Sequence, residues 1–182
     1  VISQVGGVAS DVTGLMASQR QMVHLAHYDS LTALPNQLLF YEQLRRLIAL
    51  SHRTGLRLGV MVIDLDRFRS VNETLGHTSG DELLRQVAGR LSGSLRESDM
   101  VCRLSGDVFG VILAELENTE QAAVVGRRMI ETLALPVKVD GQDLFATASL
   151  GVAFFPQDGQ DGHTLVRNAE AAMRFAKQGG RN

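Results

Sequence analysis

Two hydrophobic patterns alternate along this chain, namely short continuous apolar runs and longer stretches in which apolar residues recur every three or four positions. Residues 58–64 form a continuous apolar run that ends at Asp64, which is typical of a central strand buried on both faces. The second pattern predicts amphipathic helices. These helices are expected near residues 38–51, 81–95, 122–133 and 165–176.

A strand, a tight turn and a second strand are predicted from Val101 to Leu113. Apolar residues run into Ser105-Gly106 and out again, and Gly106 can adopt a positive φ without steric cost. Asp107 lies at the tip of this turn. Because an acid between two apolar strands is costly to bury, we expect Asp107 to be exposed, paired or bound to a cation.

The predicted elements after residue 54 follow one another as strand, helix, strand, strand, helix, hairpin, strand and helix. The hairpin surrounds Gly141, and residues 146–155 form the last strand. Since helices and strands are mixed and at least one strand pair is a hairpin, the pattern favours an α/β (α+β) fold. Its sheet is expected to be largely antiparallel, with helices packed on it.

The chain ahead of residue 29 is predicted to contain two further elements. Residues 3–9 could form one strand, and apolar residues from Leu15 to Ala26 predict a helix with a narrow apolar seam. The seam fits a short coiled coil and a helix packed on its own domain equally well. Pro35 then predicts an irregular connection before the next helix.

The composition narrows the possible functions. The 182 residues suit one main domain plus an appendage, and a net charge of -2 without a long basic run argues against nucleic acid as a partner. The single cysteine, Cys102, excludes an internal disulfide and favours a reducing compartment. No apolar run reaches the roughly 20 residues that span a bilayer. The start of the chain lacks the pattern of a signal peptide, so we expect a fragment of a longer protein.

Two predicted strands end at or turn around an acid, Asp64 and Asp107. If these strands are neighbours in the sheet, two carboxylates meet at one edge, where hard oxygen ligands suit a Mg²⁺ ion that also holds phosphates. Asp66 is a third candidate ligand, although a cap on the turn after the strand is its better-supported role.

Further polar residues lie where they could contact a nucleotide. Lys177 and Arg181 flank the glycines that end the last helix, where they either favour the helix C-terminus or clamp a triphosphate. Asn72 and Asp81 lie in or beside the connection after the first acidic strand. An aspartate accepts hydrogen bonds from the N1–H and exocyclic amine of guanine, whereas adenine has no donor at N1. Taken singly, each of these residues is more often plain surface.

Together these segments resemble the GGDEF domain of diguanylate cyclases over residues 29–182. The matching segments are Asp29–Asn36, Asp64–Asn72, Leu75–Asp81, Arg103–Phe109 and Ala176–Asn182. The resemblance implies a class III nucleotidyl-cyclase-like palm with a five-stranded, mostly antiparallel sheet. It also implies that two GTP-loaded domains face each other, and that each 3′-hydroxyl attacks the other's α-phosphate to give cyclic di-GMP and pyrophosphate.

The resemblance also implies roles for individual residues. Mg²⁺ or Mn²⁺ would be held by the catalytic pair Asp64 and Asp107 and by the backbone carbonyl of Leu65. Guanine would be read by Asn72 and Asp81, and the phosphates held by Lys177, Arg181 and Arg69. Arg69 stands where the family usually has a lysine, which keeps the charge but changes its geometry. Arg96 and Asp99 match an inhibitory site for cyclic di-GMP, which Arg127 or Arg128 would complete.

The family signature Gly-Gly-Asp/Glu-Glu-Phe reads here Ser105-Gly-Asp-Val-Phe109. Val108 replaces the glutamate that the family uses at the metal and the reacting hydroxyl. Loss of one such group commonly costs on the order of 10² to 10⁴ in rate. Folding should not suffer, because valine favours strands.

We therefore expect a GTP-binding or dimerising regulatory domain with little or no cyclase activity. The alternatives are an active diguanylate cyclase, for which Asp64 and Asp107 suffice, and a purely structural linker. The segment Gly7–Thr13 resembles the end of a PAS sensor domain, so residues 1–13 are expected to be its last strand and residues 14–28 a signalling helix. The resemblance implies a sensor–GGDEF protein, and such proteins often continue into an EAL phosphodiesterase domain after the position of Asn182. The expected location is the bacterial cytoplasm, with tethering to the membrane through segments outside this chain.

Overall fold

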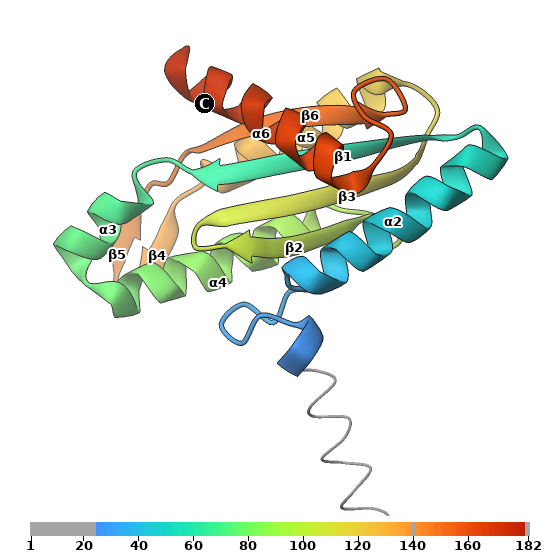
Figure 1. Ribbon diagram of the computed structural model, residues 1–182. Helices are drawn as coiled ribbons and strands as arrows, with labels where there is room; N and C mark the ends of the chain where they lie inside the picture. Colours follow the sequence, from blue (N-terminus) through green and yellow to red (C-terminus); the bar gives the residue numbers. More distant parts are fainter. Residues whose placement is uncertain (1–24, 140, 181–182) are drawn as a thin grey trace, which may run out of the picture.

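The computed structural model describes residues 25–139 and 141–180 and consists of a sheet with helices on both faces (Figure 1). The central sheet is antiparallel, with strand order β2-β3-β1-β6. Its strands are β1 (Arg57–Leu65), β2 (Met100–Ser105), β3 (Val108–Leu116) and β6 (Ala148–Phe155). The predicted largely antiparallel sheet with packed helices is therefore confirmed.

Among the described residues the sheet has four strands, where the family resemblance implied five. The two remaining strands, β4 (Val137–Val139) and β5 (Gln142–Leu144), pair only with each other. Helix α4 (His77–Gly93) contacts this small hairpin and the residues that lead into it. The Gln86 side chain donates to the Lys138 carbonyl at 2.9 Å, and Arg90 donates to the carbonyls of Leu135 and Pro136.

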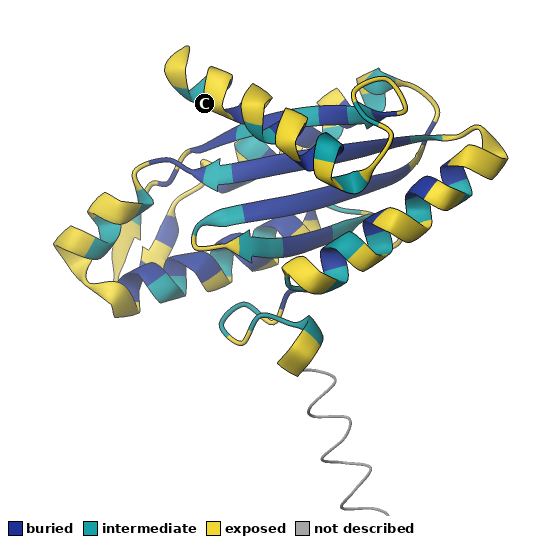
Figure 2. Ribbon diagram, viewed as in Figure 1, coloured by how far each residue is buried: buried dark blue, intermediate teal, exposed yellow. Residues whose placement is uncertain are grey.

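Strand β1 divides its side chains between two hydrophobic layers, as the period of two in a strand requires. Val60 and Val62 pack with helices α2 (Gln37–Thr54) and α6 (Gly162–Gln178). The alternating residues of β1 pack with α4 and α5 (Thr119–Leu133) on the other face. Figure 2 shows buried strands between helices whose outward faces are exposed. The prediction of a central strand buried on both faces is thus confirmed.

The connection after β1 is more regular than the sequence pattern predicts. Helix α3 (Phe68–Leu75) contains no fully buried residue, so it leaves no helical spacing of core positions in the sequence. Gly76, at φ 85°, separates α3 from α4, which therefore begins at His77 and not at the predicted Asp81. The result is a helical hairpin in place of a polar loop.

The predictions for the first part of the chain mostly lie outside the described residues. This holds for the PAS-like strand at residues 1–13 and for residues 14–24 of the expected signalling helix. Residues 25–27 are helical and are followed by an isolated bridge between Tyr28 and Pro35. Within residues 25–139 and 141–180, no helix combines the length and the hydropathy that a membrane crossing needs.

Candidate functional site

The two predicted acids meet at one edge of the sheet, as their positions in the sequence led us to expect. Asp64 pairs with Val108 in the antiparallel register of β1 and β3, so Asp107 is one residue from the position opposite Asp64. The Leu65 N–H also donates to the Asp107 carbonyl at 3.3 Å. Residues more than forty positions apart in the sequence therefore form one corner of the molecule.

The electrostatics of this corner favour a cation. Burial and the neighbouring charge of Asp64 raise the pKa of Asp107, while Lys177 and Arg103 act in the opposite direction. Two carboxylates that disfavour each other's charge are stabilised when a divalent ion lies between them. Asp64, Asp107 and the Leu65 carbonyl offer the oxygen donors that Mg²⁺ prefers.

This donor set would hold only part of the coordination shell of such an ion. Within the described part of the chain, no group of three His, Cys, Asp or Glu side chains is arranged to hold a metal. A Mg²⁺ ion with two carboxylate ligands keeps positions for water and for phosphate oxygens. The residues present therefore fit a metal that arrives with a nucleotide better than a permanently bound structural ion.

Lys177 contacts one of these acids directly. Its Nζ donates to Oδ1 of Asp64 in an ion pair whose side chains are 28% and 17% exposed. Sequence reasoning assigned Lys177 to phosphates. In the structure this lysine of α6 pairs instead with Asp64, the proposed metal ligand. Its second predicted partner in phosphate binding, Arg181, lies outside the described residues.

Val108 lies on the same side of the sheet as Asp64. It packs against the layer formed with α2 and α6 and lines a cavity of about 300 Å³. The same cavity is lined by Asp64, Lys177, Tyr41 and Glu170, among others. A side chain at position 108 therefore faces the charged corner, and in this chain it presents methyl groups to it.

The two residues predicted to read guanine come from adjacent helices. Asn72 lies on α3 and Asp81 on α4, and both are partly exposed. Among the described residues, neither side chain has a hydrogen-bond partner, so both remain available to a ligand. Arg69, on the exposed side of α3, pairs with Glu73 at 2.8 Å, and its side chain is 90% exposed.

The carboxylate of Asp66 has a structural role. Its carboxylate is buried and accepts hydrogen bonds from Thr147 Oγ1 at 2.8 Å and Ser149 Oγ at 2.9 Å. Arg67, with φ 58°, stands at the start of α3, and no side chain caps that helix. The cap on the turn therefore stays a prediction, and two partners of the Asp66 carboxylate are donors from β6 and from the residue before it.

Sequence reasoning missed a contact between the start of the domain and the signature turn. Arg103 Nη1 donates to both Asp29 oxygens, at 3.0 and 3.2 Å, and its Nε donates to the Gly106 carbonyl at 2.8 Å. The Arg103 N–H also donates to the Pro35 carbonyl at 2.9 Å. The only signal in the sequence is that both residues fall in family-like segments. No spacing predicts a pair 74 positions apart.

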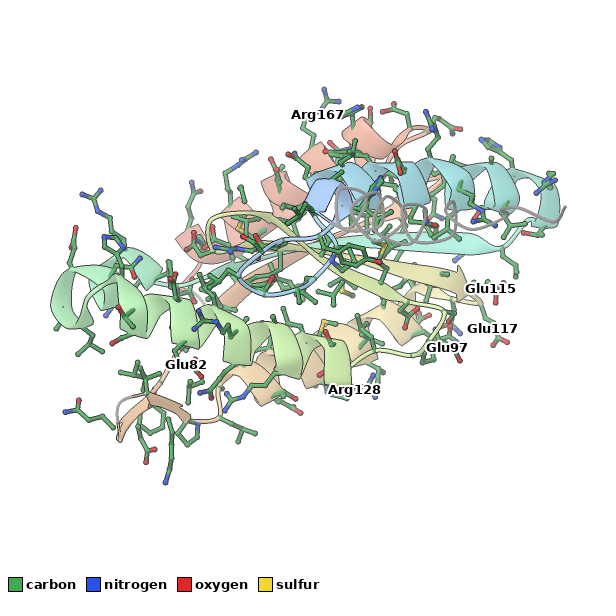
Figure 3. All side chains as sticks on the ribbon, turned by 90° about the horizontal axis from the view of Figure 1, so that it is seen from below. Glu82, Glu97, Glu115, Glu117, Arg128 and Arg167 are labelled. Atoms are coloured by element: carbon green, nitrogen blue, oxygen red, sulfur yellow. The ribbon has the colours of Figure 1, made fainter. Side chains whose placement is uncertain are left out.

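The residues of the predicted inhibitory site lie together. Asp99 Oδ2 accepts from the Arg96 N–H at 3.3 Å and from its Nε at 3.4 Å, and Asp99 Oδ1 accepts from the Ala114 N–H at 3.3 Å. The Asp99 side chain is 1% exposed, whereas that of Arg96 is 55% exposed. Arg128 donates to the Ser94 carbonyl at the same end of the molecule (Figure 3).

Comparisons with known proteins agree on one family. Residues 26–182 match the family described as "Diguanylate cyclase, GGDEF domain". The cyclic di-GMP phosphodiesterase NbdA of Pseudomonas aeruginosa is 39% identical over 180 residues, which are 99% of this chain and 22% of that protein. The diguanylate cyclase TpbB of the same species is 36% identical over 165 residues, which are 90% of this chain and 38% of that protein.

Solved structures give the same result. The GGDEF domain of TpbB (YfiN) from Pseudomonas aeruginosa superposes with a TM-score of 0.83 at 37% identity, covering 85% of this chain and 91% of that one. The coiled coil and GGDEF domain of DgcB from Caulobacter crescentus, solved in complex with c-di-GMP, gives a TM-score of 0.85 at 26% identity, covering 94% and 91%. This chain therefore belongs to the GGDEF domain family of cyclic di-GMP signalling proteins.

Proposed function

We propose that this domain binds GTP together with one divalent ion and forms little or no cyclic di-GMP. The observation that carries the proposal is the register of β1 and β3, which pairs Asp64 with an apolar residue, Val108. The groups suited to binding are present at the same corner, and the acid that the family uses at the reacting hydroxyl is replaced.

The individual side chains support binding in the following way. A divalent ion, when bound, would neutralise phosphate charge at Asp64 and Asp107. Asp81 can accept from the two donors on the guanine edge, with Asn72 beside it. Lys177 can exchange Asp64 for a phosphate oxygen, because both partners are anionic and, among the described residues, one ion pair holds Lys177.

The same geometry argues against efficient turnover. A 3′-hydroxyl needs a group that accepts its proton, or stabilises its charge, when it attacks the α-phosphate. Val108 can do neither. We propose that the domain therefore acts as a nucleotide-responsive regulatory module, as a homodimer when functional, in the cytoplasm of a bacterium.

A second candidate is an active diguanylate cyclase. The convergence of Asp64 and Asp107 favours it, since that pair alone could hold the metal. The chain spans less than two fifths of the relatives reported above, whose names include both cyclases and phosphodiesterases. The activity of the whole protein, with PAS or EAL neighbours, is therefore a separate proposal.

Binding of cyclic di-GMP at Arg96 and Asp99 is a further part of the proposal. Arg96 is exposed and could stack on or pair with the ligand. Asp99 is already held by Arg96 and by the Ala114 N–H, so its carboxylate must leave these partners before it can accept from guanine. We therefore expect binding at this site to be weak.

Calorimetry and a product assay together test the proposal. The domain is titrated with GTP and, separately, with cyclic di-GMP, each with Mg²⁺, and incubations with GTP are examined by chromatography. Saturable GTP binding that is lost in Asp81→Ala, with little or no product even when dimerisation is enforced by a fused coiled coil, is the expected result. Cyclic di-GMP formation at ordinary cyclase rates would establish the second candidate instead. Absence of GTP binding would leave only a structural role.

A further inference from the structure

Helices α3 and α4 are adjacent (Figure 1), and the Asn72 side chain of α3 lies against Gly80 of α4. A Cβ atom built on Gly80 would lie 1.9 Å from Asn72 Oδ1, 3.0 Å from Asn72 Cγ and 3.3 Å from Phe68 Cζ. The first of these distances is far inside van der Waals contact. Any side chain at position 80 would therefore displace the amide of Asn72.

The backbone does not require a glycine here. Gly80 lies inside α4, where glycine is less favourable than alanine by about 1 kcal/mol, and its φ is not in the left-handed region. Gly89 and Gly93 of the same helix give a direct comparison, since a Cβ on either would meet nothing within 4 Å. What distinguishes Gly80 is the amide that lies on it.

We propose that Gly80 is a positioning residue for guanine recognition. It provides the space in which the Asn72 amide rests, and Asp81 follows Gly80 directly in the chain. One residue thus sets the place of the amide and the next supplies the carboxylate. This inference rests on the proposed function, because it assumes that Asn72 and Asp81 form the guanine site.

If Gly80 positions Asn72, the preference of the domain for GTP over ITP should depend on residue 80. Guanine carries a 2-amino group that hypoxanthine lacks, so the ratio of GTP to ITP affinity reports whether the polar groups around that edge are correctly placed. A shifted Asn72 amide changes this ratio. A change in α4 that only destabilises the fold lowers the affinities for GTP and ITP by the same factor.

The test compares Gly80→Ala with the matched control Gly89→Ala in the same helix. Affinities for GTP and ITP are measured with Mg²⁺ by calorimetry, and Tm is measured for each variant. Gly80→Ala should weaken GTP binding by about tenfold, the equivalent of one lost hydrogen bond to a charged or polar ligand group, and should reduce the preference for GTP over ITP. Gly89→Ala should leave both affinities unchanged.

A double variant separates positioning from folding. In Asn72→Ala/Gly80→Ala no amide remains in the way of the new methyl group, so its affinities should equal those of Asn72→Ala alone. If Gly80→Ala lowers Tm, the added Asn72→Ala change should restore it. Failure to restore Tm, additive losses of affinity, or an unchanged GTP preference in Gly80→Ala would overturn the inference alone. A wild-type domain that binds neither nucleotide would overturn the proposed function together with it.

Discussion

Lys177, near the end of α6, forms an ion pair with Asp64, at the end of β1, although 113 positions separate them in the chain. Asp64 is also a proposed ligand of the divalent ion. A lysine ammonium beside this carboxylate offsets its negative charge and repels a divalent ion, so the two cations compete electrostatically. The structure therefore places an internal cation against the proposed metal ligand.

Lys177→Gln should consequently strengthen metal binding while it weakens nucleotide binding. Removal of the competing ammonium should raise the affinity for Mn²⁺ in the absence of nucleotide by about three- to tenfold, and the affinity for GTP should fall because a phosphate partner is lost. Electron paramagnetic resonance of free Mn²⁺ measures the first effect and calorimetry the second. Arg174→Gln is the control, since Arg174 pairs with Glu170 on the same helix. Weaker Mn²⁺ binding in Lys177→Gln would contradict the competition.

Val108→Glu should produce cyclase activity. The register places position 108 opposite Asp64, so the new carboxylate faces the charged corner without any change in the backbone. We expect product formation to rise by on the order of 10² or more above that of the wild-type domain in a dimerised form. Val108→Gln has the same length without the charge and should remain near the wild-type rate. A folded, GTP-binding Val108→Glu domain with no gain in rate would show that position 108 is not the missing element.

The ion pair of Asp29 with Arg103 should make stability depend on pH. Burial alone would raise the pKa of Asp29, but hydrogen bonds from Thr32 and Arg103 outweigh it and lower the pKa below the ordinary value of 3.8. A lowered pKa in the folded state stabilises the protein above the unfolded pKa, and this contribution is lost as the pH falls through the folded value. Asp29→Asn should thus reduce the free energy of unfolding at pH 7 by about 1 kcal/mol, with part of the pair's strength screened by solvent.

Chemical unfolding of the wild type and Asp29→Asn between pH 7 and pH 3 measures this effect. The difference between the two proteins should shrink as the pH drops below about 4. Arg103→Lys keeps the charge but cannot donate to Asp29 and to the Gly106 carbonyl from two separate nitrogens, so it should show an intermediate loss of stability. A difference that stays constant over the whole range would mean that the ionised carboxylate is not responsible.

Asp66→Ala should destabilise the fold without removing a nucleotide contact. It leaves the Ser149 hydroxyl, buried at 1% exposure, without its acceptor, for a cost of about 1–3 kcal/mol in urea unfolding. Arg69→Ala, at an exposed position, should change stability by less than about 0.5 kcal/mol but weaken GTP binding. If Asp66→Ala instead abolished Mn²⁺ binding in a domain of normal stability, the structural role assigned to Asp66 would be wrong.

The elements with a strong period were predictable from the sequence. The apolar run of β1 and the turn at Gly106 gave the central strand and the signature hairpin, and their meeting placed Asp64 beside Asp107. These predictions succeed because the buried positions of one strand or helix appear in the sequence as a regular pattern of apolar residues. The valine in place of the signature glutamate could also be identified from the sequence, since Val108 lies inside a segment that matches the family.

Other features left no periodic trace. Helix α3 contains no fully buried residue, so its eight residues show no helical spacing of core positions and were predicted as a loop. The partners of Asp66 and of Arg103 come from segments far away in the chain, and only the folded register brings them together. The resemblance implied a fifth strand in the sheet, whereas among the described residues β4 and β5 pair with each other. Their contacts with Arg90 and Gln86 of α4 join distant segments and were not predicted from the sequence.

The contact of Arg103 with Asp29 has a practical consequence for anyone who excises this domain from a longer polypeptide. Arg103 is mostly buried, with 14% of its side chain exposed, and it supports the backbone of the signature turn at Gly106. A fragment that begins after Asp29 would lack the carboxylate that pairs with this guanidinium. Arg103, which also donates to the Gly106 carbonyl in the signature turn, would then be less firmly held. We therefore expect a stable fragment to need Asp29, which lies ahead of helix α2 in the chain.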